Sequence, residues 1–252
     1  ISTLSELRSR GLFDETLEDF FAAAVSAKRN IVIAGGTGSG KTTLLRALIN
    51  EVSASERIVT IEDAYELGLD RFEDLHPDHD ALQSRPANIE GRGEITLADL
   101  TRMALRMDPD RVIVGEVRGA EAFPMLMAMS QGNNGSMCTM HADSTRSVFP
   151  KLAAYVSMAS TGLPVETVNL LVASAIHFVV YIDNTNSVRR VTSVREVVDS
   201  EGSTIVSNEI FHLNIEDGLV TGFPLREHTR KLLAAHGLGT HTSSVPKIEN
   251  AS

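Results

Sequence analysis

Three shortages in the sequence exclude whole classes of protein. The 252 residues contain one cysteine, Cys138, so the chain can form neither an internal disulfide nor a cysteine-cluster zinc site. No apolar run approaches the ~18 residues that span a membrane. Basic residues are in the minority, with 23 lysine and arginine against 33 aspartate and glutamate, for a net charge of -10. A dedicated binder of nucleic acid or of an acidic membrane surface normally carries a basic face, so we expect no direct nucleic-acid partner and no membrane insertion.

The start of the chain also lacks familiar signals. It begins at Ile1 rather than methionine and carries no signal-peptide pattern. We therefore expect a processed chain or a fragment with further domains upstream. The single cysteine suits a reducing, cytoplasmic location. The length of the chain, 252 residues, is enough for one large α/β domain, or for one domain with a small appendage.

The most informative stretch runs from Ile31 to Leu45 and reads IVIAGGTGSGKTTLL. An apolar run leads into GGTGSGKT, which fits the P-loop pattern G-x-x-x-x-G-K-[ST] between a strand and a helix. Glycines let successive N–H groups face a phosphate, and the following helix adds its positive end. Lys41 is predicted to reach the β- and γ-phosphates, and the Thr42 hydroxyl to bind Mg²⁺. The predicted nucleotide-binding residues are Gly36, Thr37, Gly38, Ser39, Gly40, Lys41, Thr42 and Thr43. Because the chain has no N-K-x-D-type motif for guanine, the favoured nucleotide is ATP.

Hydrolysis also needs a group that positions Mg²⁺ and one that orients or deprotonates water. Two glutamates follow runs typical of buried strands: Glu62 after RIVTI, and Glu116 after RVIVG. Ligands bind at the carboxyl edge of open α/β sheets, although a strand-end carboxylate is often merely solvated. Glu62 is the predicted general base. Glu116 stands where a Walker B acid belongs, but Gly115 replaces the usual aspartate, so its predicted contact with Mg²⁺ runs through water.

His141 ends another predicted strand, and spacing alone leaves open whether it is structural or functional. Five arginines crowd the same third of the chain: Arg85, Arg92, Arg102, Arg106 and Arg118. Most surface arginines are simply solvated. However, one or two of them would be needed to bind the γ-phosphate, either within the chain or across a subunit boundary. Arg92 and Arg118 are the predicted catalytic ones.

Apolar periodicity predicts the helices and strands of an α/β protein, and we expect them to form a largely parallel sheet flanked by helices. Residues 1–13 are predicted to form a short helix and a turn, and the other predicted helices are 16–28, 41–52, 96–107, 120–130, 145–160, 164–175 and 227–236. The predicted strands are 31–34, 57–61, 112–114, 136–140, 177–182, 189–198, 204–213 and 219–223. The polar stretch 64–94 is predicted to be one long loop. These elements divide into N-terminal lead-in helices (1–28), an ATPase core (29–182), a small mixed or antiparallel β/helix region (183–238) and a disordered tail (239–252). The role of residues 185–223 is left open.

Five blocks occur in a fixed order: GGTGSGKTT, VTIEDAYEL, RPANIEGRGEIT, LRMDPDRVIVGEVRG and GSMCTMHADS. Together they resemble the type II/type IV secretion ATPase superfamily, and most of all its CpaF-like, Tad-pilus branch, over roughly residues 1–180. The resemblance implies a RecA-like P-loop core and a homo-hexameric ring. It also implies ATP hydrolysis that powers pilus assembly, secretion or conjugation. The implied partners are inner-membrane platform proteins, and the implied location is the cytoplasmic face of that membrane.

The resemblance also implies roles for single residues. Glu62 falls in the family's "Asp box", Glu116 in its atypical Walker B motif, and His141 at the end of its "His box". One position departs from many relatives, because Asn133 replaces the histidine that often follows the glycine opening this box; a role that needs an ionisable group there is in doubt. The family's N-terminal domain clamps nucleotide and supplies arginines. Little of it precedes Ile31, so the chain alone is expected to bind ATP and form a ring poorly.

Two other functions remain open at this stage. A DNA-dependent translocase with a similar core would show turnover that DNA stimulates and salt weakens. A nucleotide-switched binding module would bind ATP tightly and hardly hydrolyse it. The sequence does not fix the system that is powered, or the size of the ring.

Overall fold

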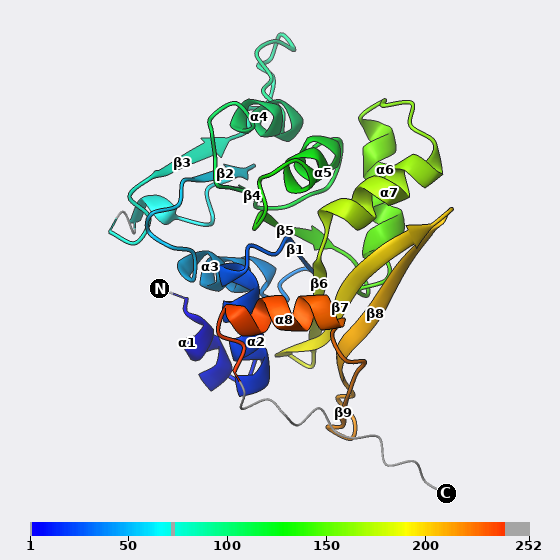
Figure 1. Cartoon of the computed structure of the whole chain (residues 1–252). Coiled ribbons are helices and arrows are strands. Elements are labelled where there is room, and N and C mark those ends of the chain that lie inside the picture. Colours follow the sequence, from blue (N-terminus) through cyan, green and yellow to red (C-terminus); the bar gives the residue numbers. More distant parts are fainter. Residues whose placement is uncertain (1, 72–73, 240–252) are drawn as a thin grey trace, which may run out of the picture.

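The computed structural model describes residues 2–71 and 74–239. Within these residues the strands form one nine-stranded sheet in the order β3-β2-β4-β5-β1-β6-β7-β8-β9 (Figure 1). The strands are β1 (Ile31–Gly35), β2 (Ile58–Glu62), β3 (His79–Gln83), β4 (Arg111–Val114), β5 (Met137–His141), β6 (Phe178–Thr185), β7 (Val188–Glu201), β8 (Thr204–Leu213) and β9 (Val220–Thr221). The helices are α1 (Leu4–Ser9), α2 (Glu15–Ser26), α3 (Lys41–Asn50), α4 (Leu97–Ala104), α5 (Ala122–Ser130), α6 (Val148–Met158), α7 (Val165–Ala175) and α8 (Glu227–Ala235), with a 3-10 turn, η1, at Leu69–Arg71.

The sheet has a parallel part and an antiparallel part. From β3 to β6 every neighbouring pair is parallel, whereas β6, β7, β8 and β9 pair antiparallel. The predicted α/β class, with a largely parallel sheet and a C-terminal antiparallel region, is therefore confirmed. The boundary predicted at residue 182 falls inside β6, and the C-terminal strands extend the sheet of the core. Residues 240–252 of the predicted disordered tail lie outside the described residues.

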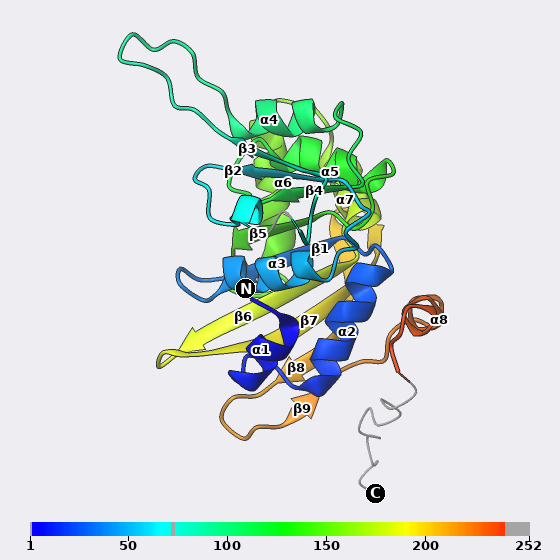
Figure 2. The same cartoon turned by 90° about the vertical axis from the view of Figure 1, so that its left-hand side faces the viewer.

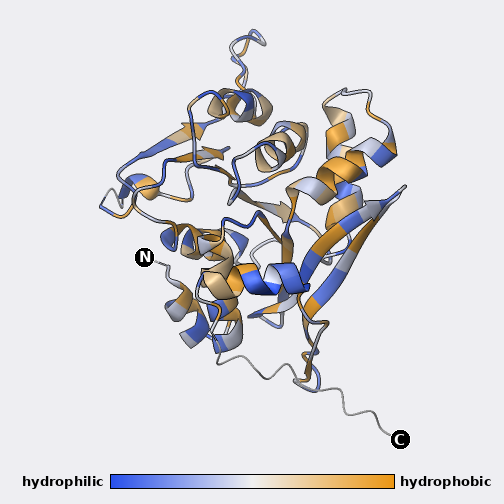
Figure 3. Cartoon of the chain, viewed as in Figure 1, coloured by the Kyte–Doolittle hydropathy of each residue, from blue (hydrophilic) through white to orange (hydrophobic). Residues whose placement is uncertain are grey.

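Helices cover both faces of the sheet and bury two apolar cores. Side chains alternate along each strand: Ile31 and Ile33 of β1 face α1, α2 and α3, while Val32 and Ala34 face the helices α4 to α7. Helix α8 packs on the first of these faces, next to α2, through Leu233. Figure 2 shows α2 and α8 on the same side of the sheet, and Figure 3 shows the alternating hydropathy along β7 and β8.

The prediction that residues 64–94 form one loop is wrong, because strand β3 lies within them. The strand reads HDALQ and lies at the edge of the sheet, where its residues are only partly buried. An edge strand needs no continuous apolar run, and this one is held partly by charge. Arg57 Nη1 and Nη2 each lie 2.5 Å from a carboxylate oxygen, of Asp78 and Asp80 respectively. The apolar-run criterion therefore missed it.

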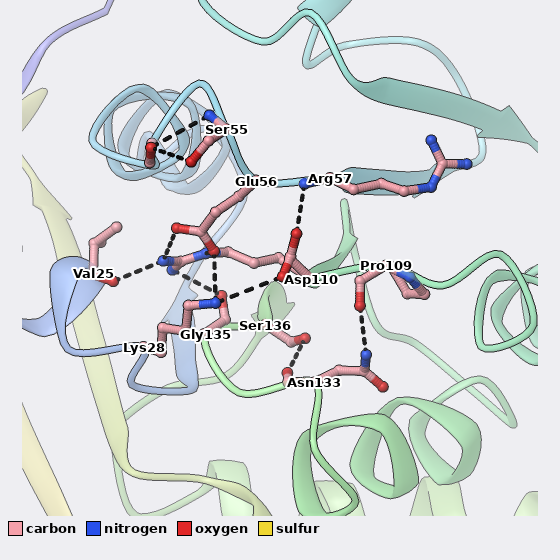
Figure 4. A network of polar contacts seen from close by, with 12 residues as sticks. Val25, Lys28, Ser55, Glu56, Arg57, Pro109, Asp110, Asn133, Gly135 and Ser136 are labelled. Carbon is pink, nitrogen blue, oxygen red and sulfur yellow. Dashed lines mark hydrogen bonds and ion pairs between the residues drawn. The ribbon is translucent and has the colours of Figure 1, made fainter.

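An ionic network closes the amino-terminal edge of the sheet (Figure 4). Arg111, which begins β4 and is 1% exposed, donates from Nε and Nη2 to the two carboxylate oxygens of Glu56, each at 2.9 Å. It also donates to the carbonyl of Val25 at 3.0 Å, and Lys28 Nζ lies 3.1 Å from Glu56 Oε2. Burial acts to raise the pKa of Glu56, but the hydrogen bonds and charges of Arg111 and Lys28 bring it below its ordinary value. The network ties α2 to the start of β4.

Asn133, the residue that departs from many relatives, lies at this same edge. Its Nδ2 donates to the carbonyl of Pro109 at 2.7 Å, and its own carbonyl accepts from Ser136 Oγ at 2.6 Å (Figure 4). It precedes β5, whereas His141 ends that strand. At ~3.3 Å per residue, the strand separates the two by more than ~10 Å. The missing histidine therefore concerns a loop remote from the predicted nucleotide site.

No helix in residues 2–71 and 74–239 is long and apolar enough to cross a membrane.

Candidate active site

The register of the parallel strands brings the predicted site residues to one edge of the sheet. Gly35 at the end of β1 pairs with His141 at the end of β5. Glu62 ends β2, and Glu116 follows β4, which lies between β2 and β5. A cleft of about 320 Å³ opens at this edge. Its lining residues are Thr37, Gly38, Lys41, Thr42, Glu62, Asp63, Ala64, Glu66, Gly115, Glu116, Arg118, Thr139 and His141.

The P-loop has the backbone geometry that phosphate binding requires. Gly38 and Gly40 have φ of +70° and +100°, a region that favours glycine. Gly40 is the N-cap of α3 and gives it no side-chain cap, so the first N–H groups of that helix are left for a ligand. Lys41 Nζ donates to the carbonyls of Gly35 and Gly36 at 3.1 and 2.8 Å, which keeps the ammonium inside the loop. Burial lowers the pKa of Lys41, partly offset by Glu116.

The loop is too tight for larger residues and contains a buried polar atom. A Cβ on Gly35 would lie 2.5 Å from Ser39 Oγ and 2.7 Å from the carbonyl oxygen of Ile182. Ser39 is 1% exposed, and its Oγ has no hydrogen-bond partner among the described residues. A cradle of free N–H groups with an unpaired hydroxyl beneath it fits a phosphate chain.

Glu62 is the most buried carboxylate in the cleft, at 4% exposed. Its Oε1 accepts hydrogen bonds from the N–H groups of Glu66 and Leu67 at 3.0 and 2.9 Å. Burial raises the pKa of Glu62; the two N–H donors act against this, while the charge of Glu66 adds to it. The side chain lies against Gly115, where a Cβ would come 3.0 Å from Glu62 Cγ. A carboxylate with a raised pKa, fixed through one oxygen, has the properties of a general base.

Glu116 and His141 form a pair on the neighbouring strands. His141 Nε2 lies 2.8 Å from Glu116 Oε1, and both side chains are partly exposed to the cleft. Behind them, Lys151 Nζ donates to the carbonyl of His141 at 2.9 Å, and Thr139 Oγ1 donates to the carbonyl of Gly115 at 2.5 Å. The imidazole and the carboxylate thus lie side by side in the cleft that Lys41 and Thr42 also line.

The two predicted arginines lie in different places. Arg118 lines the cleft and forms an ion pair with Asp63, whose Oδ1 also accepts from Ser84 Oγ at 2.6 Å. Arg92 does not line the cleft. It lies on an exposed extension between β3 and α4, the arm (residues 86–94), which a bridge between Arg85 and Ile95 closes at its base. Figure 2 shows the arm projecting away from the sheet.

Five lining residues were not among the predicted site residues, and three of them have polar side chains: Asp63, Glu66 and Thr139. A signal existed for the first two, because Asp63 follows Glu62 directly and Glu66 stands four residues after Glu62. Thr42 Oγ1 lies 3.4 Å from Glu66 Oε2. Thr139 gave no signal, since a threonine inside an apolar strand is ordinary.

The donor set fits a metal that is bound together with phosphate. In the part of the chain that the structure describes, no group of three or more histidine, cysteine, aspartate or glutamate side chains is arranged to hold a metal alone. Mg²⁺ takes oxygen ligands and keeps several waters, using one or two protein ligands plus substrate phosphates. Thr42, Glu116 and Glu66 supply such oxygens in this cleft.

A model of the family described as type II/IV secretion system protein matches residues 2–208. The chain belongs to this family. A putative conjugal transfer protein of Mycobacterium tuberculosis is 38% identical over 187 residues, which cover 74% of this chain and 51% of that protein. The type IV secretion system protein VirB11 of Brucella suis is 39% identical over 168 residues, which cover 66% of this chain and 45% of that protein. The chain thus spans about half the length of the family members that it matches.

Solved structures of similar proteins agree with the fold. The crystal structure of the VirB11 ATPase from the Brucella suis type IV secretion system, in complex with sulphate, has a TM-score of 0.63 at 34% identity, over 76% of this chain and 54% of that one. The pilus retraction motor PilT with bound ADP has a TM-score of 0.53 at 17% identity, over 94% of this chain and 57% of that one. At that identity the second likeness concerns the fold alone.

Proposed function

We propose that this chain is the ATP-hydrolysing part of a motor in a type IV-like secretion, pilus-assembly or conjugation apparatus. The observation that carries the proposal is one cleft in which the P-loop groups Lys41 and Thr42 face a buried glutamate, Glu62, and the Glu116–His141 pair. Family membership adds support, because the matched relatives are named as secretion and conjugal transfer proteins.

Each group in the cleft has a proposed role. The P-loop N–H groups and Lys41 bind the phosphates of ATP. Glu62 accepts a proton from the attacking water, and its fixed Oε1 leaves Oε2 to orient that water. Thr42 directly, and Glu116 through water, would hold Mg²⁺, which neutralises phosphate charge. His141, beside Glu116, orients that carboxylate and the waters around it.

Arg118 and Arg92 are proposed to act in different places, the first in the cleft of its own chain and the second at a subunit boundary. Arg118 neutralises charge inside the cleft, next to Asp63. Arg92 lies on the exposed arm, outside the cleft of its own chain, which supports a contact across a subunit boundary, where an arginine can stabilise the charge that develops on the phosphates of a neighbour.

The assembly is proposed from the family. We propose a homo-hexameric ring of the CpaF-like, Tad-pilus type, at the cytoplasmic face of the inner membrane, working on platform proteins of the secretion system. The acidic chain, at -10, supports recruitment by protein contacts rather than by the charge of the lipid surface.

The proposal is tested with the protein at its full natural length. Phosphate release and mass in solution are measured with no nucleotide, with ATP and with ADP, for the wild type and Lys41→Ala. Turnover by an oligomer that Lys41→Ala abolishes is the expected result. A monomer that binds ATP without turnover indicates a nucleotide-switched binding module instead. Stimulation by DNA that weakens steeply with salt indicates a translocase.

A further inference from the structure

A second hollow lies beside the P-loop, and Glu62 does not line it. It has a volume of about 300 Å³ and is lined by Gly38, Gly40, Lys41, Thr42, Thr43, Glu66 and Arg189. Four of these residues, Gly38, Lys41, Thr42 and Glu66, also line the cleft with the carboxylates. The two hollows therefore adjoin at the P-loop, and among the lining residues of the second hollow Arg189 is the one cation outside the P-loop.

The strand register explains why Arg189 reaches this place. Strand β6 pairs with β1 through Ile182 and Gly35, and then continues to Thr185 beyond the point where β1 turns into the P-loop. Asn186 and Ser187 have positive φ, at 54° and 64°, and turn the chain back as a tight hairpin. Arg189 on β7 then pairs with Asn184 on β6. The hairpin thus extends past the carboxyl edge of the sheet, alongside the P-loop.

Two contacts fix the hairpin against the loop. Asn184 Nδ2 donates to the carbonyl of Gly38 at 3.5 Å. A Cβ built on Gly40 would lie 3.6 Å from Arg189 Cδ, so the aliphatic part of Arg189 lies against the glycine that caps α3. Within the described residues the guanidinium has neither a hydrogen bond nor an ion pair, although the chain carries 33 acidic residues. An arginine packed at its stem and unpaired at its head is set to bind an anion.

We propose that Arg189 binds the α-phosphate of the nucleotide and so fixes the end of ATP or ADP that is not cleaved. This inference rests on the function proposed for the P-loop. The γ-phosphate belongs in the cleft that Glu62 and Glu116 line and Arg189 does not. The phosphates are cradled along the loop, so the groups in the hollow of Thr43 and Arg189 meet the opposite end of the chain of phosphates. The antiparallel region, whose role the sequence left open, thereby supplies a nucleotide-binding residue.

The test uses the protein at its full natural length and compares equilibrium affinities for ATP and ADP, together with kcat and KM. The variants are Arg189→Ala, Arg189→Lys and a matched control, Arg190→Ala, which removes the same charge from the next position of the strand, on the opposite face. We expect Arg189→Ala to weaken the affinities for ATP and for ADP by the same factor, about 10-fold or more. The variant should also raise KM and leave kcat near that of the wild type. Arg189→Lys should restore part of the affinity, and Arg190→Ala should resemble the wild type.

Other results overturn the inference. Unchanged affinities in Arg189→Ala exclude a contact with the nucleotide, and a loss confined to ATP moves the contact to the γ-phosphate. If Arg189→Lys does not restore affinity, the contact is not an ion pair with the α-phosphate, and stacking of the guanidinium on the base explains the loss instead. The failure of the P-loop proposal looks different: the wild type would then bind neither nucleotide, and Lys41→Ala would change nothing. Melting curves of each variant monitor folding, and Arg189 is exposed, so they should coincide.

Discussion

A Cβ atom on Gly115 would lie 3.0 Å from Cγ of Glu62 and 3.5 Å from its Oε1. The glycine that departs from the usual Walker B aspartate is thus the residue that makes room for the buried carboxylate of the adjacent strand. The two features belong together: the acid, Glu62, ends β2, and Gly115, which directly follows β4, leaves space for its side chain. A larger residue at position 115 would occupy the volume that Glu62 fills.

Gly115→Ala should therefore impair turnover through Glu62. The added methyl group displaces the Glu62 side chain by a few tenths of an ångström, and a small displacement of a catalytic group costs up to about 10²-fold in rate. ATP hydrolysis and ATP affinity are the measurements, and affinity should change little. Gly119→Ala is the control, since a Cβ there meets Glu121 Oε2 at 3.4 Å, an ordinary contact. Equal turnover in the two variants would contradict the steric argument.

Glu62→Gln should preserve or raise stability at neutral pH. Glutamine keeps the Oε1 that accepts from Glu66 and Leu67. Because burial raises the pKa of Glu62 above its ordinary 4.5, the folded chain holds this proton more tightly than the unfolded chain, and stability falls as the pH rises through the folded pKa. Each kcal/mol recovered corresponds to roughly 2–4 °C in Tm.

Melting temperatures measured from pH 4 to pH 8 check this sign. The difference between Glu62→Gln and the wild type should be largest near pH 8 and disappear as the pH falls below 4.5. A variant that is less stable at pH 8 and gains relative to the wild type on acidification would show that Glu62 is stabilised in its charged form.

Glu116 and His141 should act as a unit. Their contact of 2.8 Å positions the carboxylate that faces Lys41 and Thr42. We expect Glu116→Gln and His141→Gln each to lower kcat by about 10- to 100-fold, and the double variant to lose little more than either single one. Rate constants that multiply in the double variant would indicate two independent roles.

Arg111 should be essential to folding rather than to chemistry. Removing one member of a buried, hydrogen-bonded ion pair costs about 3–5 kcal/mol, and Arg111→Leu leaves the Glu56 carboxylate without its main partner. Arg102→Leu is the control, because its pair with Asp99 is exposed, at 3.5 Å, and is expected to contribute less than about 1 kcal/mol. Urea unfolding measures both. Similar losses in the two variants would contradict the importance assigned to the network.

The sequence was most predictive where a local pattern decides the structure. The P-loop and the apolar strands on either side of it are local signals, and they are found where they were expected. The largely parallel sheet was expected together with the RecA-like core that the family resemblance implies. Once Glu62, Glu116 and His141 were recognised at strand ends, their meeting at one edge required only that the strands be parallel and adjacent.

The rest depended on contacts that are distant along the chain. Strand β3 is defined by ion pairs to Arg57 and by its place beside β2, not by its own composition. Arg189 stands 149 residues after Gly40 in the sequence, and its position beside that glycine depends on the length of β6 and on a two-residue turn. The relation between Gly115 and Glu62 is likewise one of packing across two strands, which no spacing along the chain reveals.

The central claim is that Glu62 is the base of an ATPase, and one comparison tests it most directly. ATP affinity and phosphate release are measured side by side for the wild type and Glu62→Gln in the protein at its full natural length. We expect the affinities to agree within about threefold while turnover falls by about 10²-fold or more. Turnover that stays at the wild-type level in Glu62→Gln, with binding intact, would contradict it and move the search for the base to Glu116.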